Sequence, residues 1–192
     1  MHFSPSLYQI GLGVGLVSLS AFFIGLILAF SFRIEAQRSW QPFQAPTFLW
    51  LSTVVLGISS WLVEAGRFSL RRALVSVYRG RLLAAIILGV MFVAVQISAG
   101  MNLLDQGVAT TANPHGSAFY LFMGIHGTHL LGGLVWLTYL YVRSARLYEG
   151  SENDLRKHRL VAGAAATYWH FMGVVWAVLF YFLIRWSRLG GA

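Results

Sequence analysis

Five long stretches of the chain contain no charged residue and consist mainly of apolar side chains. These charge-free runs cover residues 1–32, 39–63, 82–104, 106–142 and 160–184. A helix needs about 20 mostly apolar residues to cross the hydrocarbon layer of a bilayer, which is about 30 Å thick. Every run is long enough, so the pattern predicts an all-α, polytopic transmembrane five-helix bundle. We expect one integral-membrane domain over residues 1–192, with spans at approximately 8–32, 46–63, 82–101, 118–142 and 163–184.

The composition supports a membrane protein rather than a soluble one. Hydrophobic residues make up 57% of the chain and charged residues 10%, whereas a soluble domain is about one quarter charged. The net charge of +8 would suit a nucleic-acid partner, but every lysine and arginine lies between or beyond the apolar runs. Basic residues at helix ends are typical of membrane topology, so we expect no nucleic-acid partner. The chain has no cysteine, which excludes a disulfide and a thiolate metal site.

Basic residues are distributed unequally between the two sides of the predicted bundle. Loops 64–81 and 143–162 contain ten lysine and arginine residues. The opposite side receives the other four, Arg33, Arg38, Arg185 and Arg188. Cytoplasmic loops of membrane proteins carry an excess of these residues. We therefore expect the N-terminus in the cytoplasm and the C-terminus outside.

Three histidines lie within the predicted spans, at His126, His129 and His170. The first two share a helix face, a spacing that metal ligands use. However, His129 lies about 20 Å from the cytoplasmic end of its span and His170 about 10 Å from the same side, an offset that metal–nitrogen bonds of about 2 Å cannot bridge. We therefore favour hydrogen bonds across closely packed helices over a metal or haem site. The glycines expected to bring these helices together are Gly124, Gly127, Gly132 and Gly133.

None of the six acidic residues lies clearly inside a predicted span. Glu64 is placed at the cytoplasmic edge of the second span, within one helical turn of Arg67. A proton carrier ordinarily needs ionisable groups inside the bilayer, so the pattern argues against independent proton transport. Two other classes stay open as alternatives: a small transporter, and a stand-alone membrane haem or metal protein that uses the three histidines.

Two motifs stand out from the composition. Residues 119–133 contain the pattern Gly-x-His-Gly-x-His, with its histidines at His126 and His129. Residues 164–176 contain Tyr168-Trp169-His170-Phe and Val-Val-Trp. The first motif resembles one in subunit III of the haem-copper (cytochrome c or quinol) oxidases, and the second resembles the last helix of that family. Weaker similarity extends over nearly the whole chain. Five helices resemble the short bacterial form, which lacks the first two of seven helices.

The resemblance implies an accessory subunit of a respiratory terminal oxidase, with no redox centre of its own. In that family, haem and copper reside in partner subunits I and II. There cytochrome c or quinol is oxidised and oxygen is reduced, with coupled proton translocation. The resemblance implies a multi-pass protein of the bacterial inner membrane that packs on subunit I and supports its stability, lipid environment and sustained proton uptake. We expect no catalytic residue, cofactor or metal in this chain.

The resemblance also implies roles for single residues. Arg143 matches an arginine that contacts phospholipid head groups in the family, and a guanidinium at this depth suits a phosphate. The residues expected to act as structural polar or packing groups are His126, Gly127, His129, Tyr168, Trp169, His170, Trp176 and Gln96. Four acids of better-known members are replaced here, by Leu19, Ala99, Gly163 and Gly173. A related accessory protein of nitric oxide reductases shares the motifs and is the nearest alternative.

Overall fold

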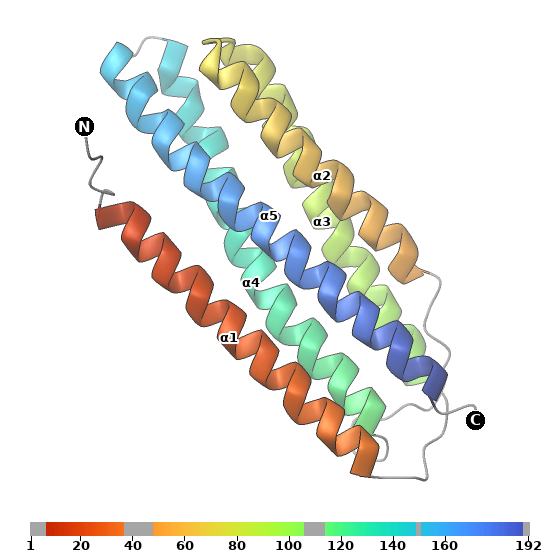
Figure 1. The fold of residues 1–192 in the computed structure, drawn as a ribbon. Coiled ribbons are helices and arrows are strands. Elements are labelled where there is room, and N and C mark those ends of the chain that lie inside the picture. The colour runs from red at the N-terminus through yellow and green to blue at the C-terminus, as the bar shows by residue number, and fades with distance from the viewer. Residues whose placement is uncertain (1–6, 37–47, 106–113, 149–150, 190–192) are drawn as a thin grey trace. The chain divides into compact units, whose positions relative to one another are not determined.

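The structure, a computed structural model, describes residues 7–36, 48–105, 114–148 and 151–189, which are mostly helical (Figure 1). The helices are α1 (Leu7–Ala36), α2 (Phe48–Arg71), α3 (Val75–Asp105), α4 (Pro114–Ser144), the 3-10 helix η1 (Ala145–Tyr148) and α5 (Glu152–Leu189). The described residues contain five helices long and apolar enough to cross a membrane, which confirms the predicted all-α class and its five spans. The orientation of the termini stays a prediction.

The chain consists of two compact units, residues 1–38 and residues 39–192. The first unit contains α1, a helix of 30 residues. Within α1, the Ser20 hydroxyl donates to the Leu16 carbonyl at 2.8 Å, so this polar group is satisfied inside its own helix. The second unit contains α2 to α5. The expectation that both units form a single membrane domain stays a prediction.

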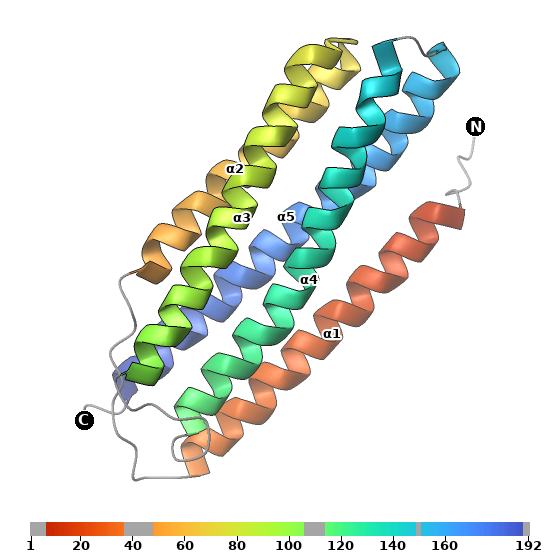
Figure 2. The ribbon, with the colours of Figure 1, turned by 180° about the vertical axis from the view of Figure 1, so that it is seen from behind.

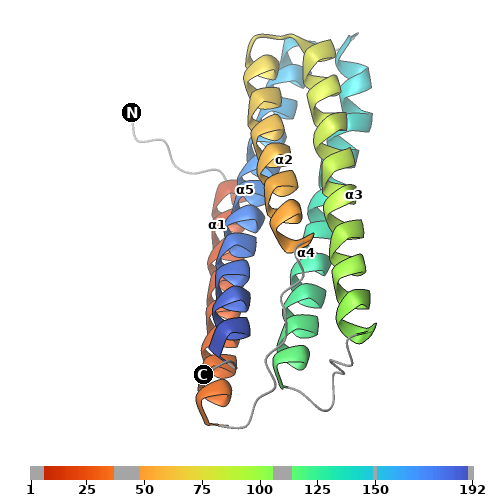
Figure 3. The ribbon, with the colours of Figure 1, turned by 90° about the vertical axis from the view of Figure 1, so that its right-hand side faces the viewer.

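Helices α2 to α5 form an antiparallel four-helix unit. Helix α2 contacts α3 and α5, and α4 contacts the same two helices, so the four close into a ring (Figures 2 and 3). Side-chain bonds fix the register of neighbouring helices. The Ser59 hydroxyl of α2 donates to the Ala85 carbonyl of α3 at 2.9 Å, and the Tyr120 hydroxyl of α4 donates to the Gly100 carbonyl of α3 at 3.0 Å.

Helix α5 begins well before the span that its apolar residues predict. It starts at Glu152 rather than near Gly163, because Ser151 caps it. The Ser151 hydroxyl accepts from the Asp154 N–H at 3.3 Å, and the Asp154 carboxylate accepts from the Ser151 N–H at 3.1 Å. Apolar composition therefore marks the part of α5 that suits hydrocarbon, whereas the cap determines where the helix starts.

The core of the four-helix unit is aromatic, and two glycines leave room for it. The Trp169 ring of α5 is fully buried. A Cβ atom added to Gly89 of α3 would lie 3.0 Å from that ring and 2.6 Å from the Leu134 side chain. A Cβ atom on Gly133 of α4 would also lie 3.0 Å from the ring. These two positions therefore let α3 and α4 approach the indole closely.

Candidate functional site

His126 lies in the aromatic core of the four-helix unit. Its side chain is buried, and its ring centroid lies 6.1 Å from that of Phe92 on α3 and 5.6 Å from that of Trp176 on α5. Trp176 in turn links α5 to α2, because its indole N–H donates to the Thr53 hydroxyl at 3.0 Å. His126 therefore joins α4 to α3 and α5 through ring contacts, and Trp176 joins α5 to α2 through a hydrogen bond.

His129 bonds to the backbone of its own helix. Its Nδ1 donates to the Ile125 carbonyl at 2.8 Å, one turn earlier in α4. The bond between helices comes from Tyr168 of α5, whose hydroxyl donates to the His129 carbonyl at 2.9 Å. Of the glycines on α4, Gly133 lies against Trp169, whereas Gly127 has no atom within 4 Å of an added Cβ.

Gln96 joins α3 to α2. Its side-chain amide donates to the Ser52 hydroxyl at 3.0 Å. The amide oxygen is buried and has no hydrogen-bond partner among the residues that the structure describes. Ser52 itself donates to the Leu49 carbonyl at 2.8 Å, so the Ser52 hydroxyl both accepts and donates. The Gln96–Ser52 bond and the Ser59–Ala85 bond both join α2 to α3, at two different levels along these helices.

His170 lies at the line of contact between α2 and α5, which we call the α2–α5 seam. Its Nδ1 forms a hydrogen bond of 2.5 Å with the Ser60 hydroxyl, and its Nε2 lies 3.3 Å from Oε2 of Glu64. The same Glu64 oxygen accepts from Arg67 at 2.8 Å. We call Ser60, Glu64, Arg67 and His170 the seam cluster. It contains the one contact between a histidine and an acid that the described residues form within salt-bridge distance.

Glu64 is expected next to Arg67 from the sequence, whereas its contact with His170 is not. The available signal was the spacing of Ser60 and Glu64, which are four residues apart and so share a face of α2. Helix α2 continues to Arg71, seven residues beyond Glu64, so Glu64 does not lie at the end of its helix. Gly163, where the resemblance expects an acid, lies beside Arg67: an added Cβ would be 3.7 Å from its Nη2.

The histidines occupy separate places in the fold. His126 packs among aromatic rings in the core, and His170 bonds to α2 at the seam. Within the described part of the chain, no group of three or more histidine, cysteine or acidic side chains is placed to hold a metal ion.

Arginine side chains hold helix ends together where α2 passes into α3 and α4 passes into α5, which we call the basic end. Arg79 donates to the Tyr141 carbonyl at 3.0 Å, and Arg159 donates to the Leu70 carbonyl at 3.0 Å. Terminal carbonyls of a helix lack partners inside it and carry partial negative charge. These two arginines therefore join α3 to α4 and α5 to α2.

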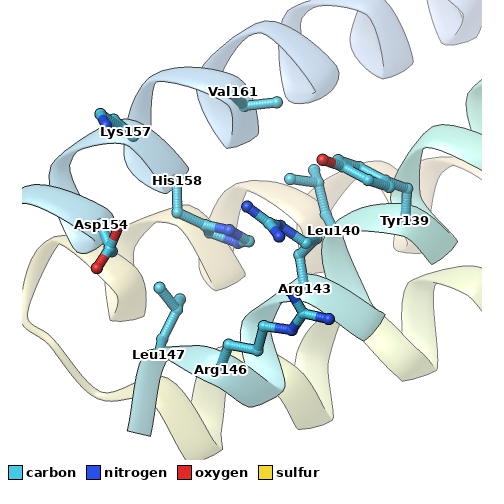
Figure 4. Close-up of a pocket in the computed structure, with 9 residues that line it drawn as sticks. All are labelled: Tyr139, Leu140, Arg143, Arg146, Leu147, Asp154, Lys157, His158 and Val161. Atoms are coloured by element: carbon cyan, nitrogen blue, oxygen red, sulfur yellow. The ribbon is translucent and has the colours of Figure 1, made fainter. Parts of the chain in front are cut away.

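A pocket of about 330 Å³ lies at the basic end between α4 and α5 (Figure 4). Its lining residues are Tyr139, Leu140, Arg143, Arg146, Leu147, Asp154, Lys157, His158 and Val161. The Arg143 side chain is exposed, unlike that of Arg79, which is bonded to α4. Three basic side chains against one carboxylate give the pocket a positive character that suits an anion.

Comparisons with known proteins place these features in one family. The family model described as "Cytochrome c oxidase subunit III" matches residues 6–188. The probable cytochrome c oxidase subunit 3 of Mycobacterium tuberculosis is 32% identical over 182 residues, which cover 92% of this chain and 86% of the relative. Subunit 3 from Synechocystis is 31% identical over 186 residues, covering 93% of this chain and 76% of the relative. Subunit 3 from Thermostichus vulcanus is 29% identical over 190 residues, covering 97% and 91%.

Proposed function

Because the chain belongs to the cytochrome c oxidase subunit III family and is an accessory subunit of a haem-copper oxidase, we propose that it acts as a non-catalytic scaffold. In this proposal the chain packs on subunit I, and haem and copper reside in subunits I and II. The membrane that holds the complex is the inner membrane of a bacterium. Electron transfer to oxygen then takes place wholly in the partner subunits.

The observation that carries this proposal is that polar side chains within the predicted spans form hydrogen bonds between helices. Trp176 bonds to Thr53, Tyr168 to His129 and Gln96 to Ser52, and each bond joins two helices. Bonds of this kind are worth about 0.6 kcal/mol on average in a membrane protein, so several together fix the arrangement of the bundle. Groups engaged in this way suit a rigid support for a neighbouring subunit.

The proposed support for proton uptake is electrostatic. The basic end carries most of the charge of the four-helix unit, including Arg143, Arg146 and Lys157 around the pocket. Each basic residue close to the membrane surface attracts anionic lipid by about 1 kcal/mol. We propose that a phospholipid phosphate binds near Arg143, and that this lipid and the basic residues keep the proton entry region of subunit I in its working environment.

Removing the chain from the purified oxidase tests the scaffold role. The haem spectrum and the initial rate of oxygen reduction should stay largely unchanged, because no electron passes through this chain. The activity should then decline faster over repeated turnovers than in the full complex, and adding the chain back should restore the slower decline. Immediate loss of all oxidase activity with haem retained would show a direct catalytic part and overturn the proposal.

A further inference from the structure

The seam cluster contains ionisable side chains that the four-helix unit covers only in part. The side chain of Glu64 is 49% exposed and that of His170 is 37% exposed. Apolar side chains flank the cluster on its outer side: Trp61 on α2 is 67% exposed and Val174 on α5 is 63% exposed. Each is about one helical turn from a member of the cluster. The cluster is therefore a polar spot on an apolar surface.

The position of His170 along α5 sets the depth of this spot. His170 lies seven residues after Gly163, where the predicted span begins. Seven residues of helix span about 10 Å, which is about one third of the hydrocarbon thickness. Glu64 contacts His170 and lies at the same level. Lipid head groups remain at the edges of the hydrocarbon layer, so at this depth the outer side of the cluster faces mainly acyl chains.

A half-exposed carboxylate at that depth needs more partners than acyl chains supply. Arg67 and His170 both bond to the same oxygen of Glu64, Oε2, so the second oxygen can accept from a third group. Acyl chains have no hydrogen-bond donors, and an ionised group that faces them is costly. Charge complementarity therefore favours an N–H donor or a cation on a neighbouring helix. Residues 7–32 of α1 contain no lysine, arginine or histidine, and their one side-chain N–H donor is Gln9, in the first turn of that helix.

We infer that the α2–α5 seam is a docking surface for a transmembrane helix of another oxidase subunit. That helix places an N–H donor, from lysine, arginine, histidine, asparagine or tryptophan, against Glu64, and its apolar side chains cover Trp61 and Val174. The inference rests on the proposed function, because it takes the other oxidase subunits as the source of the helix. It adds which face they cover and which chemistry they bring to it.

A photo-reactive residue at position 61 tests the docking surface without altering the seam cluster. Trp61→p-benzoylphenylalanine replaces one exposed aromatic ring by another. Irradiation of the intact oxidase should link this residue to another subunit, and mass spectrometry of the product should locate the link within a transmembrane segment. The isolated chain, irradiated as a control, should give no such product. Links confined to lipid or to α1 of the same chain would overturn the inference.

Variants at Glu64 test the chemistry. The amount of this chain per haem is measured after the complex is purified through a tag on subunit I. Glu64→Leu should lower that ratio about tenfold, the factor expected when a hydrogen bond to a charged group is lost. Glu64→Gln, which keeps an acceptor oxygen, should lower it less. Ser98→Leu is the matched control, because Ser98 is exposed on α3 and bonds only to the Ala94 carbonyl of its own helix.

The outcomes separate this inference from the proposed function. Equal ratios for Glu64→Leu and Ser98→Leu, with both chains showing the helix content and thermal unfolding of the parent, would overturn the docking chemistry. If the Glu64→Leu chain does not fold, the cross-linking experiment at position 61 decides instead, because that variant leaves the seam cluster intact. If the unaltered chain fails to purify with an oxidase at all, the proposed function itself is wrong.

Discussion

Single residues determine how closely the helices pack around Trp169. Gly89 and Gly133 leave out the side chains that would otherwise meet the indole, and the Trp169 ring fills the space between α3, α4 and α5. The packing role of Trp169 is predictable from its motif, whereas that of Gly89 is not. A glycine inside an apolar run can serve several structural roles. Only the packed fold shows that Gly89 faces the Trp169 ring and allows it to lie close to α3.

Gly89→Ala should destabilise the four-helix unit by about 1–3 kcal/mol, because the added methyl group overpacks a filled core. Its Cβ would lie 2.6 Å from Leu134 and 3.0 Å from Trp169, so a buried ring has to move. Thermal unfolding in detergent, followed by circular dichroism, measures the change. Gly57→Ala on α2 is the control, since its Cβ meets nothing within 4 Å. Equal unfolding temperatures for the two variants would contradict the packing argument.

Arg143 is the residue at which lipid binding can be tested most directly. Arg143→Gln removes a positive charge from the pocket at the basic end and should lower the phospholipid retained per complex, as counted by native mass spectrometry. Arg156→Gln removes the same charge from α5, where the Arg156 side chain bonds to Asn153 and does not line the pocket. A similar loss of lipid in both variants would mean that net charge, rather than the pocket, holds the lipid.

At the scale of the element, the sequence predicts which segments form helices but not where every helix starts or which residues of two helices meet. The five apolar runs predict the five helices because hydrocarbon selects for length and apolarity. They do not predict where α5 starts, because its cap at Ser151 lies outside the apolar run. Nor do they pair Glu64 with His170, since this contact depends on which face of α2 meets α5. Contacts between residues more than a hundred positions apart need the packed fold.

The turn between α2 and α3 contains a strained residue. Ala73 has a φ of 57°, in the left-handed region where a Cβ is disfavoured. The N–H of Leu74 donates to the Ser69 carbonyl at 3.0 Å and closes the end of α2 around it. Ala73→Gly should therefore stabilise the unit by about 0.5–1 kcal/mol, since glycine takes up this conformation without a steric cost.

Thermal unfolding also measures the stability of the Ala73→Gly variant. Ala84→Gly, in the interior of α3, is the control, for which we expect the opposite change in stability. Glycine there should destabilise the unit by about 0.5–1 kcal/mol, because it raises the entropy of the unfolded chain and relieves no strain. A fall in stability for Ala73→Gly that matches the fall for Ala84→Gly would show that the turn is not strained at Ala73.

For the whole molecule, the sequence predicts the membrane topology from the distribution of charge. Ten basic residues lie in the two loops on the expected cytoplasmic side and four on the other. A reporter enzyme that is active only outside the cytoplasm should therefore be active when it is fused after Ala192. The same reporter should be inactive when it is fused after Ala73, in the turn between α2 and α3. Inactivity of the first fusion would contradict the five-span arrangement.

The bonds across the α2–α5 seam also set an order of events during synthesis. Ser60 and His170 are 110 residues apart and Thr53 and Trp176 are 123 apart, whereas α2, α3 and α4 each meet their immediate successor. Helix α5 leaves the ribosome after α2, α3 and α4, so the ring of four helices cannot close before translation of α5 is finished. A truncated chain keeps the earlier helix pairs but has no seam. A partner that recognises the seam therefore accepts only chains that already contain α5, and biogenesis of the complex waits for that helix.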